Sequence, residues 1–163
     1  MNFKSFLLPL FLTIAIFSCS DSRKELPATI SGKVTRVKDG DTIEILYDGK
    51  PLSVRFAHVD CPEMNTSQPF GKAAKQLTSD LCFGQIVSVQ NENEFDRYDR
   101  LIGVIINVKG DTVNLELIKA GLAWHYKKYS SATTYAESEI DARDRKAGLW
   151  ADENPIPPWD WRN

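Results

Sequence analysis

Histidine and cysteine are scarce in this sequence, which has two histidines and three cysteines among 163 residues. Zinc sites are built from clustered His and Cys ligands, and none of the usual zinc spacings occurs here. Neither a phosphate-binding Walker loop nor a Gly-x-Ser-x-Gly nucleophile elbow is present, which removes two large enzyme classes. Cys61 and Cys82 could pair in an exported protein, but two cysteines alone do not establish a bridge.

An excess of positive charge is also missing, because 20 Lys and Arg residues face 22 Asp and Glu residues and the net charge is −2. Affinity for a nucleic-acid backbone comes from Lys and Arg, so the chain is not an obvious nucleic-acid binder. A local basic face would be sufficient, however. Such a face could be formed by Lys72, Lys75, Lys127 and Lys128, although these lysines could equally cover solvated helix faces.

The long hydrophobic run of this chain is confined to its beginning. Lys4 precedes an apolar run over residues 6–17 that is too short to span a bilayer comfortably. This is the layout of a secretory signal, and we assign residues 1–18 to a signal peptide. Cys19 then lies where a bacterial lipoprotein is lipidated, and residues 19–28 read as a flexible tether. We expect export to the cell envelope and membrane attachment through this lipid anchor only; an ordinary cleaved signal is the alternative.

The rest of the chain predicts one α+β domain, mainly β, over residues 29–150, followed by a Pro- and Trp-rich tail over 151–163. Alternation of apolar and polar residues predicts strands over 30–37, 42–47 and 52–57. Two further strands are predicted over 86–89 and over 101–108, the latter rich in β-branched residues. Helices are predicted over 70–83, 114–118 and 134–146, with Asn114 as a cap. Five short strands with helices after the third and fifth fit a five-stranded OB-like barrel with three helices. The prolines of the tail predict an extended chain, and we expect the four tryptophans to pack the helices and tail against the barrel.

Carboxylates and one arginine gather between residues 38 and 63. Asp39 and Asp41 flank a turn glycine, Arg55 lies within a predicted strand, and Asp60 and Glu63 follow it. Carboxylate oxygens suit a hard cation such as Ca²⁺ or Mg²⁺, and the planar fork of an arginine matches phosphate oxygens. A cation, an arginine and a spare carboxylate are the minimum set for hydrolysing a phosphodiester. Asp-Gly-Asp alone is weak support, because turns commonly contain Asp for local hydrogen bonds.

Several segments, in order and spacing, resemble the thermonuclease family, of which staphylococcal nuclease is a member. The segments are Lys38–Ile43, Val54–Glu63, Phe95–Leu101, Asn114–Trp124 and Lys146–Trp150. The resemblance runs from about residue 30 to residue 150 and implies the same OB-like barrel with three helices. It further implies a monomeric, Ca²⁺-dependent nuclease that cuts DNA and RNA, single-stranded or as frayed duplex, and leaves 3′-phosphate ends.

The resemblance also assigns a role to each matching residue. Asp41 and Asp60 would be Ca²⁺ ligands through their side chains, and Cys61, at a position where the family has Thr, through its backbone carbonyl. Glu63 would activate the attacking water. Arg55 and Arg100 would clamp the scissile phosphate.

Three further positions complete this comparison. Tyr98 and Tyr129 match aromatic positions of the nucleotide pocket, where stacking tolerates any base; Tyr98 could also be core filling. Asp99 replaces the usual Gly before Arg100, and a left-handed backbone suits Asp less well than Gly. Its charge beside Arg100 makes the placement of that arginine an open question.

Two non-catalytic alternatives remain open. One is an OB-type barrel on an envelope lipoprotein that binds nucleic acid without cutting it, and the other is a purely structural envelope lipoprotein. Neither requires the complete set of acids and arginines that the sequence contains. The set comprises Asp41, Arg55, Asp60, Glu63 and Arg100.

Overall fold

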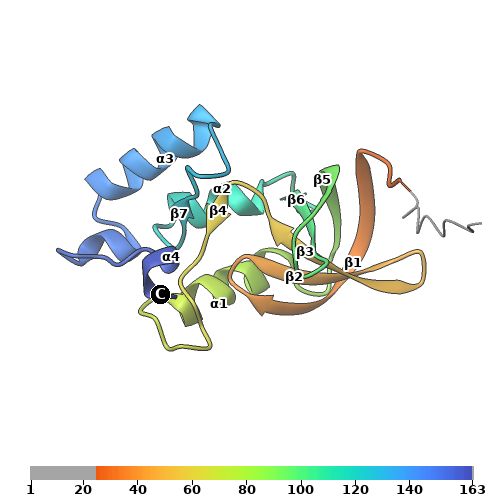
Figure 1. Ribbon diagram of the computed structural model, residues 1–163, viewed down its shortest axis with the longest axis horizontal. Helices are drawn as coiled ribbons and strands as arrows, with labels where there is room; N and C mark the ends of the chain where they lie inside the picture. The colour runs from red at the N-terminus through yellow and green to blue at the C-terminus, as the bar shows by residue number, and fades with distance from the viewer. Residues whose placement is uncertain (1–24, 163) are drawn as a thin grey trace, which may run out of the picture.

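Five strands form a closed barrel in the computed structural model, which describes residues 25–162 (Figure 1). They are β1 (Thr29–Asp39), β2 (Thr42–Tyr47), β3 (Lys50–Phe56), β5 (Ile86–Phe95) and β6 (Leu101–Ile106). Around the barrel they follow the order β1-β2-β3-β6-β5, and β5 pairs with β1 to close it. The predicted five-stranded barrel is therefore confirmed. The predicted signal peptide and Cys19 lie outside the described residues.

Along the barrel strands, buried residues alternate with more exposed ones. Along β1 the buried positions include Ile30 and Val34, and along β6 every second residue from Leu101 onwards is buried. Because successive side chains of a strand point to opposite faces, one set fills the barrel and the other faces outwards. Each neighbouring pair of strands is antiparallel except β3 and β6, which pair in parallel.

The helices lie at one end of the barrel, to its left in Figure 1, with α1 lowest, α2 at the centre and α3 at the upper left. The elements outside the barrel are β4 (Val59–Asp60), α1 (Gly71–Cys82), α2 (Val113–Lys119), β7 (Trp124–His125), α3 (Thr133–Asp144), the 3₁₀ helix η1 (Gly148–Ala151) and α4 (Pro158–Trp161). The three predicted helices are present, each within two residues of its predicted start and end. β4 and β7 form a separate two-stranded ladder, and each is too short to show a sequence period.

Asn114 does not cap α2, so this prediction is wrong. Thr112 occupies the cap position, and the buried Asn114 side chain joins the helix to the barrel instead. It accepts the Ile105 N–H at 2.9 Å and donates to the carbonyls of Ala57 (2.9 Å) and Gly103 (3.2 Å). A buried amide with these partners fixes the helix against the strands that carry the candidate site.

The tail differs from the extended chain that its prolines predict, because residues 158–161 form the short helix α4. A proline is tolerated in the first turn of a helix, where its missing N–H would have no helical partner. The sequence predicts that the tryptophans pack the helices and tail against the barrel. Instead, Trp124 and Trp150 are buried in a cluster with Ala142 and Leu149, against which Trp159 of the tail packs. This cluster is distinct from the barrel core.

The two cysteines of the domain are both buried and free, so Cys61 and Cys82 do not pair. Burial raises the pKa of the Cys82 thiol to about 12 and that of Cys61 well above its ordinary value. Both thiols are therefore protonated at neutral pH and act as small apolar side chains.

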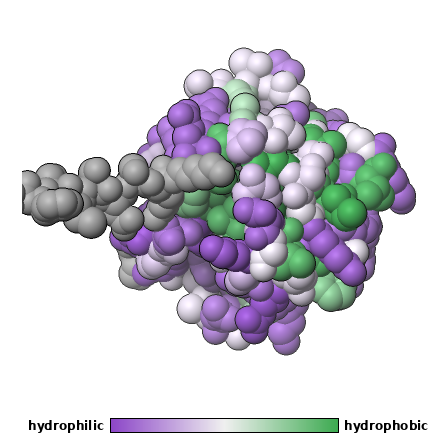
Figure 2. Space-filling model, turned by 90° about the vertical axis from the view of Figure 1, so that its right-hand side faces the viewer, coloured by the Kyte–Doolittle hydropathy of each residue, from purple (hydrophilic) through white to green (hydrophobic). Residues whose placement is uncertain are grey.

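The exposed end of the barrel, seen in Figure 2, shows hydrophobic residues in small groups among hydrophilic ones. Scattered hydrophobic residues of this kind are normal on a protein surface. Among residues 25–162, none of the helices has the length and apolar character needed to cross a membrane.

Candidate active site

The turn between β1 and β2 is pressed against α1, which fixes the position of Asp41. A side chain at Gly40 would place its Cβ 2.8 Å from the Cβ of Ala74 and 2.9 Å from that of Cys61, closer than such atoms come in proteins. Thr78 in α1 also donates to the Gly40 carbonyl at 2.5 Å. Glycine is therefore required at the centre of the turn, and the Asp41 side chain is directed into the molecule.

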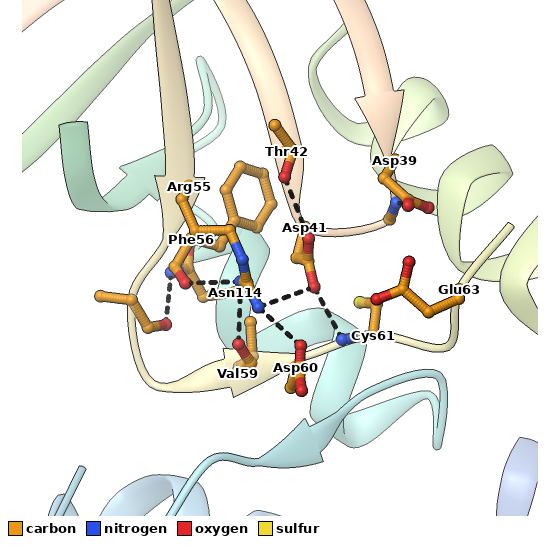
Figure 3. Close-up of polar contacts among 12 residues, drawn as sticks. Asp39, Asp41, Thr42, Arg55, Phe56, Val59, Asp60, Cys61, Glu63 and Asn114 are labelled. Atoms are coloured by element: carbon orange, nitrogen blue, oxygen red, sulfur yellow. Dashed lines mark hydrogen bonds and ion pairs between the residues drawn. The ribbon is translucent and has the colours of Figure 1, made fainter. Parts of the chain in front are cut away.

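The Asp41 carboxylate is buried, 7% exposed, and accepts two hydrogen bonds. Thr42 Oγ1 lies 3.1 Å from Oδ1, and the backbone N–H of Cys61 donates to Oδ2 at 2.7 Å (Figure 3). The second bond joins the β1–β2 turn to the segment after β4. Two predicted site segments, about twenty residues apart in the chain, therefore meet at Asp41.

Arg55, at the end of β3, bridges the two predicted cation ligands (Figure 3). Its Nη2 lies 3.1 Å from Asp41 Oδ2 and 2.7 Å from Asp60 Oδ1. Its Nη1 donates to the carbonyls of Phe56 at 3.0 Å and Val59 at 2.9 Å. Although burial lowers the pKa of Arg55, the neighbouring carboxylates raise it further, so the guanidinium stays charged.

The residues present fit a hard cation. One carboxylate oxygen of Asp41 and one of Asp60 contact the same atom, Arg55 Nη2, so the two carboxylates lie close together. Both carboxylates are almost fully buried. Burial, with the neighbouring Asp41, raises the pKa of Asp60 despite two adjacent arginines. Negative charge held this closely is stabilised by a cation, and oxygen donors suit Ca²⁺. Within residues 25–162 no three His, Cys, Asp or Glu side chains form a metal cluster, but the predicted set has only two side chains and a backbone carbonyl.

Asp39 lies at the other side of the same turn, where its carboxylate accepts the Gly40 N–H at 2.9 Å. Burial, followed by the charge of Asp41, raises the pKa of Asp39 to about 6. The turn role predicted for Asp39 is therefore present.

Glu63 lies beyond Asp60 on the loop that leads to α1. Its backbone N–H donates to the Gln68 side chain at 2.9 Å, which shapes the loop. The Glu63 carboxylate forms an ion pair with Arg162 of the C-terminal segment. Arg162 also pairs with Asp60 Oδ2 at 2.7 Å, so the tail reaches the predicted site.

Arg100 is held beside the site by two partners. Asp96 accepts from its Nε at 2.7 Å and from its Nη2 at 2.6 Å, and the Arg100 Nη1 lies 3.2 Å from Thr42 Oγ1. Because Thr42 also contacts Asp41, the second predicted phosphate clamp lies next to the carboxylates. Asp99 adopts the left-handed conformation, φ 61°, that the usual Gly would adopt. The backbone of this turn thus places Asp99 in a conformation that glycine adopts without strain, and Asp96 orients Arg100.

The two predicted stacking residues are both exposed, Tyr98 by 64% and Tyr129 by 69%. Core filling is thereby excluded for Tyr98. The guanidinium of Arg100 lies 5.3 Å from the Tyr98 ring centroid, which places this ring next to the site. The Tyr129 ring contacts the Tyr126 ring edge to face, with the ring centroids 4.9 Å apart; both residues belong to a different loop from Arg100.

Two of the four lysines line a groove beside the candidate site. Lys72 and Lys75 lie on α1 and line an open groove together with Arg36 of β1 and Met64, which follows Glu63. Lys127, by contrast, pairs with the buried Glu139 at 3.2 Å. The groove therefore has basic side chains from β1 and α1 beside the loop of Glu63.

Three contributing residues were absent from the sequence-based set: Asp96, Thr42 and Arg162. Asp96 could have been found, because it lies in the segment Phe95–Leu101 that carries Arg100. Arg162 gave no signal, since it lies in the tail outside the recognised segments, about a hundred residues after Glu63.

Comparison with known proteins agrees with this geometry. The family model described as "Staphylococcal nuclease homologue" matches residues 53–152. A protein named "uncharacterized endonuclease" from Haemophilus influenzae is 37% identical over 163 residues, covering 99% of this chain and 86% of its own. A "micrococcal nuclease" from Shigella flexneri is 38% identical over 145 residues, covering 83% and 82%. An "uncharacterized endonuclease" from Escherichia coli is 37% identical over 138 residues, covering 85% and 88%.

The matched region contains Arg55, Asp60, Glu63 and Arg100, and each alignment covers most of this chain and most of the relative. Fold, site geometry and sequence similarity therefore lead to one assignment. The chain belongs to the staphylococcal nuclease family.

Proposed function

We propose that this nuclease is Ca²⁺-dependent and hydrolyses phosphodiester bonds of both DNA and RNA, in single strands or frayed duplex, leaving 3′-phosphate ends. The observation that carries the proposal is the convergence of Asp41 and Asp60 on one point, with Arg55 between them and Glu63 beyond. Asp41, Asp60 and the Cys61 carbonyl would hold the cation. When bound, it would polarise a phosphoryl oxygen and draw off negative charge.

The side chains divide the remaining work. Glu63 takes a proton from the water that attacks phosphorus. As the new bond to phosphorus forms, the bond to the 5′-oxygen breaks; this oxygen leaves as a hydroxyl after taking a proton from solvent, and the phosphate stays on the 3′ side. Arg55 and Arg100 donate to the phosphate oxygens. Their interaction strengthens as charge grows on these oxygens, so it favours the transition state over the substrate.

Tyr98 is placed to stack against a base beside the scissile phosphate, because its exposed ring lies next to the Arg100 guanidinium. Stacking on a ring accepts any base, which fits a nuclease without sequence preference. The rival of a non-catalytic binding barrel has no use for Glu63 or for the buried pair of carboxylates.

Calcium dependence is tested by digesting heat-denatured DNA and, separately, RNA with the purified protein in the presence of Ca²⁺. Fragments are expected whose ends are 3′-phosphates, detected by their sensitivity to phosphatase. Adding a calcium chelator should reduce cleavage to background, and restoring Ca²⁺ should recover it, because Asp41 and Asp60 are left without the cation.

A parallel reaction with Mg²⁺ separates calcium from divalent cations in general. Mg²⁺ demands stricter octahedral geometry and gives up its water reluctantly, so slower cleavage is expected. No cleavage with Ca²⁺, or undiminished cleavage in the chelator, would contradict the proposal.

We further propose export and lipid anchoring through Cys19, which rest on the sequence alone. Cys19→Ser is expected to move the protein from the membrane fraction to the soluble envelope fraction, measured by immunoblotting of fractionated cells. Cys82→Ser, which alters a buried thiol, is the control and should leave the distribution unchanged. A Cys19→Ser protein that stays with the membrane would show that lipidation is not the anchor.

A further inference from the structure

The C-terminal segment is anchored by aromatic packing. Pro158 is buried at the start of α4, and Trp159 stacks on Tyr126 with centroids 5.3 Å apart and an interplanar angle of 2°. The Trp159 ring also meets Trp124 edge to face at 5.7 Å. Aromatic pairs of this kind stabilise a contact beyond the area that they bury. The segment is therefore fixed by groups that are not part of the candidate active site.

Two hydrogen bonds join the same segment to the loop that carries Glu63. Trp161 Nε1 donates to Thr66 Oγ1 at 2.8 Å, and Gln68 Nε2 donates to the Ile156 carbonyl at 2.8 Å. Gln68 is buried, and its Oε1 accepts the backbone N–H of Glu63. The tail and the Glu63 loop therefore form one unit.

This anchoring places the Arg162 guanidinium across two functional carboxylates. Its Nη2 lies 2.7 Å from Asp60 Oδ2, its Nη1 lies 3.4 Å from Asp60 Oδ1, and Nη1 also donates to Glu63 Oε1. One rigid, planar group thus bridges a predicted cation ligand and the predicted base. A bridge between two residues fixes their separation, whereas a bidentate pair with one carboxylate would not.

We propose that Arg162 is a positioning residue of the nuclease, which holds the Glu63 carboxylate at a set place relative to Asp60. This inference rests on the proposed function, because Glu63 needs a defined position only if it activates water. Misplacing a reacting group by about 1 Å can lower a rate by about 10²-fold. The loop of Glu63 is half exposed, and Arg162 is the cation that the structure places on its carboxylate.

The net charge of the site also favours keeping Arg162 in contact with the carboxylates. Asp41, Asp60 and Glu63 contribute three negative charges, and Arg55 and Arg162 two positive ones, which leaves −1. A divalent cation would make the sum +1, suited to an anionic phosphate. Without Arg162 the sum would be zero, so the arginine adds attraction for the substrate as well as order.

The opposite role would be that of a plug, which occupies the carboxylates and must leave before a cation binds. The anchors argue against it. The segment is held by buried Pro158, stacked Trp159 and two hydrogen bonds, all independent of the charge at the site. These contacts hold the backbone of the segment beside the carboxylates, so the Arg162 guanidinium stays within reach of Asp60 and Glu63 even when its side chain rotates.

The test is Arg162→Ala in the full chain, with steady-state cleavage of denatured DNA and calorimetric titration of Ca²⁺. We expect kcat to fall about 10²-fold, KM to rise only a few-fold, and the Ca²⁺ dissociation constant to stay within about threefold of the wild-type value. Free guanidinium ion at non-denaturing concentration should restore part of kcat. A side chain with only a structural role would not be replaced in this way.

Two further variants sharpen the result. Arg162→Lys keeps the charge but offers a point donor that cannot bridge two carboxylates as the planar fork does, so an intermediate kcat is expected. Arg145→Ala is the matched control, since this exposed arginine pairs with Asp141 on α3, and it should cleave at the wild-type rate. Cleavage by the wild type tests the proposed function itself, whereas the ratio of variant to wild type tests Arg162 alone.

Two results would overturn the inference. An unchanged kcat in Arg162→Ala would show that Glu63 needs no bridge. Ca²⁺ binding tightened by about tenfold or more, together with faster cleavage, would show that Arg162 is a plug that competes with the cation.

Discussion

Replacing Glu63 by glutamine is expected to slow the cleavage of denatured DNA by about 10³-fold, because a positioned base contributes about 10²–10⁴-fold to such reactions. Glutamine has the size of glutamate and can still contact Arg162, but it cannot take a proton from water. The Glu63 side chain is partly exposed, so the change should leave the fold intact. The measurement is kcat at saturating Ca²⁺, with the melting temperature recorded alongside.

Calcium binding distinguishes loss of the base from loss of the site. Asp41 and Asp60 are unaltered in Glu63→Gln, so calorimetry should still detect Ca²⁺ binding to a protein that no longer cleaves. Glu137→Gln, an exposed change on α3, is the matched control and should cleave normally. If Glu63→Gln kept the full rate, the water would be activated by another group, and the role given to Glu63 would be wrong.

The barrel could be predicted from the apolar–polar alternation of β1, β2 and β3 and from the β-branched residues of β6. Every second residue of β6 is apolar and buried, and the same holds for the first part of β1. The prediction ended β5 too early, because the burial of its side chains decreases towards the end of the strand. β5 continues to Phe95, but its last residues are polar, half exposed, and paired with a register irregularity between Asn91 and Phe95. A strand held mainly by backbone pairing leaves little trace in the side-chain pattern.

The site was predictable where its residues lie in recognisable segments and not where the fold alone assembles it. Asp41, Arg55 and Asp60 fall in two short motifs, and the structure places them in contact. Arg162 comes from a tail read as extended, and its position depends on α4 and the packing of Trp159. Asn114 was misassigned for a similar reason, because a capping residue and a buried bridging residue have the same side chain.

Removing the Arg55 side chain is expected to have the second large effect, on stability as well as on cleavage. In Arg55→Ala, two buried carboxylates and two backbone carbonyls lose their shared donor. Removing one partner of a buried ion pair costs about 3–5 kcal/mol, which for a chain of this size lowers the melting temperature by roughly 10 °C. Cleavage should fall to background because a phosphate clamp is lost. Thermal unfolding without Ca²⁺ measures the first effect.

The response of this variant to calcium tests the site more sharply than its stability alone. In the wild type Arg55 already compensates Asp41 and Asp60, whereas in Arg55→Ala only Asp60 keeps an arginine partner, Arg162, and Asp41 depends on the cation. Since a ligand that binds only the folded state stabilises it by mass action, Ca²⁺ should raise the melting temperature of the variant more than that of the wild type. Arg36→Ala, at an exposed position of β1, is the control and should change stability by about 0.5 kcal/mol or less. An equal response of Arg55→Ala and wild type to Ca²⁺ would mean that the cation does not bind between these carboxylates.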